Sequence, residues 1–78
     1  MIIEALIAYI QEKGYKVSVM TESLLIWKVA RGQRFNRNWA ISKAELNQVA
    51  DEQVLFMEAD RQMISINRAI EQYQPEGA

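Results

Sequence analysis

A β-rich stretch over residues 15–41, flanked on both sides by helical patterns, most constrains what this chain folds into. It is rich in β-branched and aromatic residues, and short polar segments interrupt it near residues 21–23 and 31–34. Apolar runs bounded by such segments are typical of strands joined by turns. We therefore predict a three-stranded antiparallel meander. Its strands are expected at residues 15–20, 24–31 and 34–41.

The register of the first hairpin follows from placing its apolar residues on one face. A three-residue loop at 21–23 sets Val17 opposite Trp27 and gathers the alternating apolar side chains of both strands. The predicted core face of this hairpin carries Tyr15, Val17, Val19, Leu25, Trp27 and Val29. The opposite face then carries Leu24 and Ile26, which no predicted element covers.

Two registers compete for the second hairpin. A two-residue loop of Gly32 and Gln33 sets Trp39 against Ile26, whereas a longer loop with a bulge sets Trp39 against Trp27. We favour the longer loop, because it brings the apolar residues of the third strand onto the core face of the first hairpin. These residues are Phe35, Trp39 and Ile41, and Arg37 lies among them.

The residues before the sheet have the pattern of an amphipathic helix. Apolar residues recur three and four positions apart, which places them on one buried side. Glu4 and Lys13 each lie at the helix end that favours their charge, and Gly14 supplies a left-handed residue that ends a helix. We predict a helix over residues 2–13. Its core-facing residues are Ile3, Leu6, Ile7 and Ile10.

The residues after the sheet predict one or two further helices. Ser42 and Glu45 form a capping box, which predicts a helix over residues 43–50. A second apolar pattern steps by three and four residues and predicts a long amphipathic helix over 52–74, followed by a tail at 75–78. Whether the two segments form one continuous helix or two stays open at this point.

These elements predict a single small α+β domain over residues 1–78, with the helices packed on one face of the sheet. The order of elements resembles that of double-stranded-RNA-binding domains. Those domains open their final helix with a cluster of lysines, whereas here a single Lys43 is followed by acidic residues. The resemblance is one of element order, and we carry no function over from it.

The chain contains neither cysteine nor histidine. The first absence removes disulfides, thiolate nucleophiles and zinc ribbons, and the second removes the commonest general base and metal ligand. The sequence also contains no glycine-rich phosphate loop. We therefore predict that the protein is not an enzyme. We expect no catalytic, cofactor-binding or metal-binding residues and no small-molecule substrate.

No segment of the sequence has the length and apolar character of a membrane span, since Glu4 interrupts the apolar start. The start also lacks the basic region and the cleavage site of a signal peptide. We expect a cytoplasmic protein that makes no membrane contact. A self-contained chain of 78 residues would also fit a small regulator or inhibitor carried by a phage or mobile element, which we take as a hypothesis.

Positive charge is concentrated in the middle of the chain, although the net charge is only −1. Residues 16–43 are basic, whereas residues 44–78 are acidic. Cations at three-residue intervals, interleaved with aromatic residues and asparagines, suit contact with a phosphate backbone and stacked bases. The predicted contact residues are Lys28, Arg31, Arg34 and Arg37. They would engage nucleic acid or an acidic protein; the alternative is a solvated hairpin tip.

Several apolar residues lie outside the predicted core, and contiguous exposed apolar patches usually mark an interface. The residues predicted to form an apolar interface are Leu24, Ile26, Phe56, Met57 and Ile64. We therefore predict a homodimer or a complex with another protein. The sequence favours a non-enzymatic interaction module, with nucleic-acid binding through the basic hairpin as the alternative.

Overall fold

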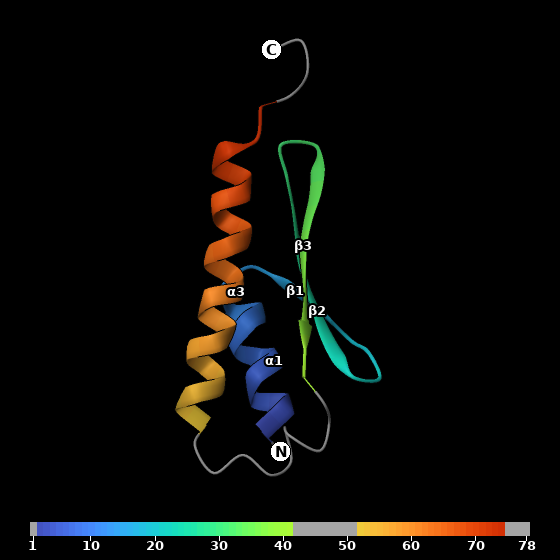
Figure 1. The fold of residues 1–78 in the computed structure, drawn as a ribbon, viewed down its shortest axis with the longest axis vertical. Coiled ribbons are helices and arrows are strands. Elements are labelled where there is room, and N and C mark those ends of the chain that lie inside the picture. Colours follow the sequence, from blue (N-terminus) through green and yellow to red (C-terminus); the bar gives the residue numbers. More distant parts are fainter. Residues whose placement is uncertain (1, 42–51, 75–78) are drawn as a thin grey trace.

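The computed structural model describes residues 2–41 and 52–74 of the 78-residue chain. In this part of the chain, two helices and three strands follow one another in the predicted order (Figure 1). They are α1 (Ile2–Glu12), β1 (Lys16–Val19), β2 (Ser23–Ala30), β3 (Gln33–Ala40) and α3 (Glu52–Gln72). The predicted α+β class and antiparallel meander are confirmed. The predicted helix at 43–50, its capping box and the tail at 75–78 lie outside the described residues.

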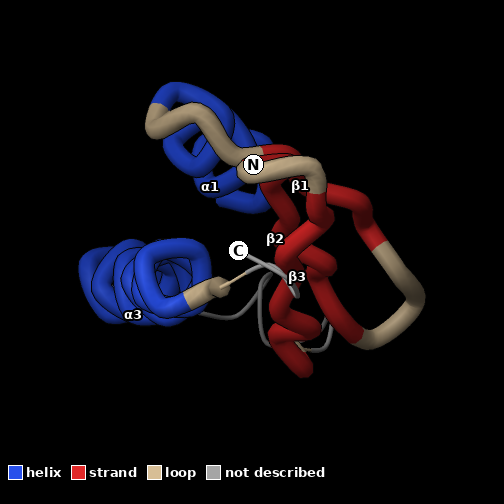
Figure 2. Tube along the Cα trace, turned by 90° about the horizontal axis from the view of Figure 1, so that it is seen from above, coloured by secondary structure: helices blue, strands red, loops and turns tan. Residues whose placement is uncertain are grey.

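The sheet has one covered and one uncovered face. Both α1 and α3 pack on the same side, and no described helix lies on the other side (Figure 2). α3 has 21 residues and α1 has 11. The C-terminal half of α3 therefore runs beside the tip of the β2–β3 hairpin, beyond the end of α1 (Figure 1). Neither described helix has the length and apolar character that a membrane span requires.

The core lies between the covered face of the sheet and the two helices. It contains Leu6, Ile10, Leu24, Ile26, Trp39, Ile41, Leu55, Ala59, Met63 and Ile66. Full burial of a leucine, isoleucine or methionine side chain contributes about 1.5–3 kcal/mol to the free energy of folding. With no disulfide to help, this set of side chains carries the stability of the described fold.

The register of the first hairpin differs from the prediction by one residue. β1 and β2 pair Val17 with Ile26 and not with Trp27. The turn is shorter than predicted, because Met20 N donates a hydrogen bond to Ser23 O at 2.8 Å and closes a two-residue turn. Since successive side chains of a strand point to opposite faces, this slip exchanges the two faces of β2.

The second hairpin adopts neither of the predicted registers. Its turn consists of Arg31 and Gly32, whose φ angles of 53° and 74° are both left-handed, as a two-residue type I′ turn requires. With this turn, Trp39 lies opposite Leu24. A positive φ is uncommon for a residue other than glycine, and neither the favoured longer loop nor the alternative turn at Gly32 and Gln33 has Arg31 and Gly32 as its two central residues.

The observed registers bury a different set of side chains from the predicted one. Leu24 and Ile26, predicted to form an apolar interface, are 1% and 0% exposed and lie at the centre of the core. The interface prediction for these two residues is wrong. Trp27 and Val29, predicted in the core, lie on the uncovered face instead. Trp39 reaches the core as predicted.

Alanine substitution on the two faces of β2 tests this register. Ile26→Ala is expected to lower the free energy of unfolding by about 2–5 kcal/mol, because it leaves a cavity in the core. Leu25→Ala, on the uncovered face, is expected to cost about 1 kcal/mol or less. Urea unfolding followed by far-UV circular dichroism measures both values. A larger loss for Leu25→Ala would support the register predicted from the sequence.

Candidate binding surface

The uncovered face of the sheet presents a central apolar stripe with a polar border. The stripe runs along β2 and consists of Leu25, Trp27 and Val29. Basic, hydroxyl and amide side chains from the two outer strands flank it on both sides. These flanking residues are Lys16, Ser18, Arg34, Asn36 and Asn38. We call the eight residues together the open sheet face.

Trp27 lies at the centre of the open sheet face between two cations. The Lys16 Nζ atom lies 5.5 Å from the centre of a Trp27 ring, and the Arg34 Cζ atom lies 4.3 Å from one. Each such cation–π contact contributes about 0.5–1 kcal/mol at an exposed site. The Trp27 Nε1 donor is buried and has no hydrogen-bond acceptor among the described residues.

The four predicted contact cations do not form one patch. Lys28 and Arg37 lie on the covered face: Lys28 Nζ lies 4.7 Å from the Tyr15 ring centre, and Arg37 Nε donates to Gln62 Oε1 at 3.4 Å. This split arises because successive side chains of a strand point to opposite faces of the sheet. Arg34 and Arg37 are three positions apart, so they lie on opposite faces. Of the four, Arg34 alone belongs to the open sheet face.

Arg31 has a structural partner at the tip of the hairpin. Its Nη1 atom donates a hydrogen bond to the Tyr73 backbone oxygen at 2.9 Å. The ring of Tyr73 also packs edge-to-face on Phe35, with 5.6 Å between the ring centres. Both contacts join the hairpin tip to the end of α3. Arg31 is therefore engaged within the chain, although its side chain stays exposed.

Charge is divided between the two layers of the molecule. Within residues 16–40, Glu22 is the single acidic residue, and it lies in a turn. The cations of the sheet are Lys16, Lys28, Arg31, Arg34 and Arg37. The described helices carry an acidic excess, with Glu4, Glu12, Glu52, Glu58, Asp60 and Glu71 against Arg61 and Arg68. The open sheet face is therefore basic and free of acidic residues.

Two of the three residues of α3 that were predicted to form an apolar interface are exposed. Met57 and Ile64 are 57% and 50% exposed and lie on the outer side of α3. Phe56 is instead half-buried and packs edge-to-face on Tyr9, with the ring centres 4.9 Å apart. Phe56 thus joins α1 to α3 and is withdrawn from the predicted interface.

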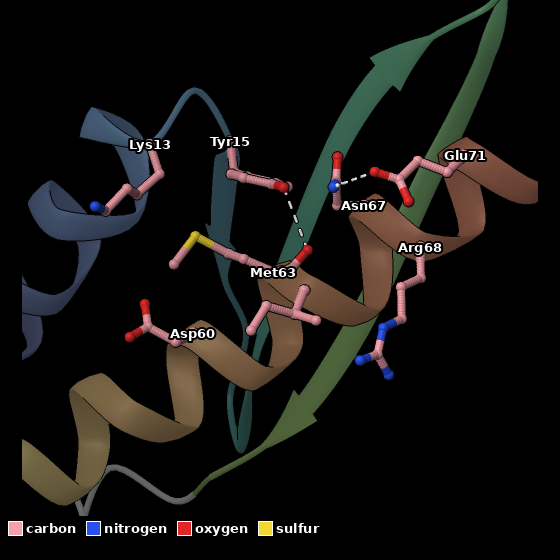
Figure 3. Close-up of a pocket in the computed structure, with 8 residues that line it drawn as sticks. Lys13, Tyr15, Asp60, Met63, Asn67, Arg68 and Glu71 are labelled. Atoms are coloured by element: carbon pink, nitrogen blue, oxygen red, sulfur yellow. Dashed lines mark hydrogen bonds between the residues drawn. The ribbon is translucent and has the colours of Figure 1, made fainter.

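A groove of about 570 Å³ lies where α1 ends and α3 continues (Figure 3). Its lining residues are Lys13, Tyr15, Asp60, Met63, Ile64, Asn67, Arg68 and Glu71. Tyr15 OH donates to the Met63 backbone oxygen at 3.2 Å, and burial raises the pKa of Tyr15. Within the described residues, no three acidic side chains gather closely enough to hold a metal ion.

Asp60 also joins the groove to α1. Its Oδ1 atom accepts a hydrogen bond from Tyr9 OH at 2.7 Å. This hydrogen bond, with burial and the nearby carboxylate charge, raises the pKa of Tyr9. The Tyr9 hydroxyl thus fixes the position of the Asp60 carboxylate beside α1.

The contact residues predicted from the sequence include neither Lys16 nor Trp27. Trp27 was placed in the core because the one-residue register slip reversed the faces of β2. The signal that identifies the correct face is the pairing of Trp27 with Lys16 and Asn36, both polar, in the neighbouring strands.

The chain matches no protein-family model, and no curated protein or solved structure is significantly similar to it.

The two tryptophans offer a direct test of this surface. The emission of Trp27, isolated in Trp39→Phe, is expected to be quenched by iodide more strongly than by caesium, because two cations flank the ring. The emission of Trp39, isolated in Trp27→Phe, is expected to resist both ions, since Trp39 is 7% exposed. Equal quenching of Trp27 by the two ions would contradict a cationic setting.

Proposed function

We propose that this protein is a non-enzymatic interaction module that binds a protein partner through the open sheet face. The observation that carries the proposal is Trp27, which lies on an uncovered face at the centre of an apolar stripe. Protein interfaces have an apolar centre and a polar rim. Tryptophan and arginine are also among the residues that most often dominate binding energy.

The charge of the open sheet face defines the kind of partner. Lys16 and Arg34 are exposed, and no acidic side chain balances them within residues 16–40 on this face. Like charges across an interface cost several kcal/mol, whereas opposite charges favour docking. The partner surface is therefore expected to be acidic around an apolar centre.

The size of the open sheet face indicates a transient complex. β2 and β3 each have eight residues, which gives a length of about 27 Å, and the three strands span about 10 Å. A stable interface buries about 800 Å² on each partner, which is more than this flat area. We therefore expect weak, reversible binding in which Trp27 provides much of the affinity.

A capture experiment with matched variants tests the proposed partner site. The amount of partner that the immobilised protein captures is compared with the amounts captured by two double variants. The sheet variant carries Trp27→Ala and Arg34→Ala. The helix variant carries Val54→Ala and Arg61→Ala, which are the same kinds of change on the outer side of α3. Loss of a tryptophan anchor costs about 2 kcal/mol or more. The sheet variant is therefore expected to retain at least about tenfold less partner, as measured by quantitative mass spectrometry.

The helix variant serves as the control for unspecific loss of surface charge and apolar area. It is expected to retain the same proteins as the unmodified chain. Equal capture by all three proteins would exclude the open sheet face as the partner site. Far-UV circular dichroism on each variant establishes that the fold is retained.

Single-stranded nucleic acid is the second candidate ligand. The specific observation is that two cations flank an aromatic ring beside Asn36 and Asn38, on a sheet that no described helix covers. Aromatic rings on open sheets stack with bases, and nearby cations track the backbone. Stacking on one aromatic residue contributes about 1–3 kcal/mol, which predicts weak binding.

Titration of Trp39→Phe with a single-stranded oligonucleotide tests this second candidate, because Trp27 is then the one fluorophore of its kind. Binding is expected to quench Trp27, and a fourfold rise in salt is expected to weaken the affinity about tenfold for two to three phosphate contacts. A polyglutamate peptide of similar charge controls for attraction of any polyanion. An unchanged Trp27 signal at low salt would rule out this ligand at this site.

A further inference from the structure

We propose that a second copy of this chain binds along the outer side of α3, with the two helices antiparallel and a two-fold axis at Ile64. The proposal does not depend on the open sheet face. It begins from three residues of α3, Asp60, Ile64 and Arg68, which are spaced four apart. Residues at this spacing lie one above the other on the same side of a helix.

The row is complementary to itself when the second helix runs in the opposite direction. An axis at Ile64 sets Ile64 against the partner's Ile64. It also sets Asp60 against the partner's Arg68, and the same ion pair recurs on the other side of the axis. A two-fold interface requires this reciprocity, in which residue i contacts j and j contacts i.

Another axis position gives a less favourable pairing. An axis at Arg61 would set Arg61 against the partner's Arg61, which places like charges face to face. With the axis at Ile64, Arg61 instead falls opposite Asn67 of the partner subunit. Opposite charges at an interface fix the register, and like charges exclude alternatives. The charge pattern therefore favours the axis at Ile64 over the axis at Arg61.

The side chains of the row are available for this contact. Arg68 is exposed and has no hydrogen bond or ion pair with any residue in the described ranges. Asp60 uses its Oδ1 atom to accept the Tyr9 hydrogen bond, and its side chain is half-buried. Ile64 is 50% exposed between them.

The groove beside the row gives the second copy a place to dock. α1 ends at Glu12, so the C-terminal half of α3 has no helical neighbour on this side among the described elements (Figure 1). Asp60 and Met63 point from α3 toward the side of Lys13 and Tyr15, whereas the Arg68 side chain extends away from that side (Figure 3). With the axis at Ile64, the partner's Ile64 would pack on Ile64, which forms part of the wall of this groove.

The contact area indicates a reversible dimer. α3 is about 32 Å long. A standard interface buries about 800 Å² on each partner, and one side of a helix of this length provides a smaller area. The ion pairs are exposed, so each contributes modestly. The dimer is therefore expected to form at high protein concentration and to dissociate on dilution.

Charge reversal tests the arrangement by sedimentation equilibrium over a wide range of concentration. Arg68→Asp sets two acidic residues against each other on both sides of the axis, and it is expected to weaken the dimer at least about tenfold. Asp60→Arg is expected to weaken it similarly. An equimolar mixture of the two variants restores both ion pairs and is expected to associate about as tightly as the unmodified chain.

Arg61→Asp is the matched control, because it makes the same change in charge about two helical turns from Arg68 and opposite an uncharged residue of the partner. It is expected to leave the association within about twofold of the unmodified chain. Arg68 is exposed, so Arg68→Asp is expected to keep the fold. This variant therefore tests the dimer even where Asp60→Arg disturbs the hydrogen bond between Tyr9 and Asp60.

Three results would overturn the proposal. These are a monomer at every concentration, an Arg68→Asp variant that associates as tightly as the unmodified chain, and a mixture that associates no better than either variant alone. None of these results bears on the open sheet face, whose test is capture of a partner or quenching of Trp27.

Discussion

The two-residue turn at Arg31 and Gly32 is the constraint on which the rest of the structure depends. Both residues are left-handed, and this conformation fixes which residues of β2 and β3 lie opposite each other. Because side chains alternate along a strand, the register also decides the face on which each side chain lies. The core position of Ile26 and the surface position of Trp27 are therefore two consequences of one backbone conformation.

The elements of this fold are predictable from the sequence, but the pairing between the strands is not. Helix periodicity and the alternation in the sheet are local signals, and they locate α1, α3 and the three strands closely. Register is a non-local property. β2 is apolar at nearly every position from Leu24 to Val29, so either of its faces satisfies the alternation rule.

The predicted binding residues show the same limit. The cations between Lys28 and Arg37 are close in sequence, yet their positions on the two faces depend on the register. Met57 and Ile64 were predicted correctly as exposed, because a helix of known phase has one outer side. Trp27 required knowledge of its cross-strand neighbours, which the sequence alone does not supply.

The contact between Arg31 and Tyr73 has a consequence for how the chain folds. The two residues are 42 positions apart, so the tip of the hairpin gains this partner only after the end of α3 has formed. A β-hairpin forms within microseconds, whereas contacts between distant residues are slower. We therefore expect the sheet to form first, with Leu24, Ile26 and Trp39 exposed on one side. Until α3 docks, that side is the surface most prone to aggregation.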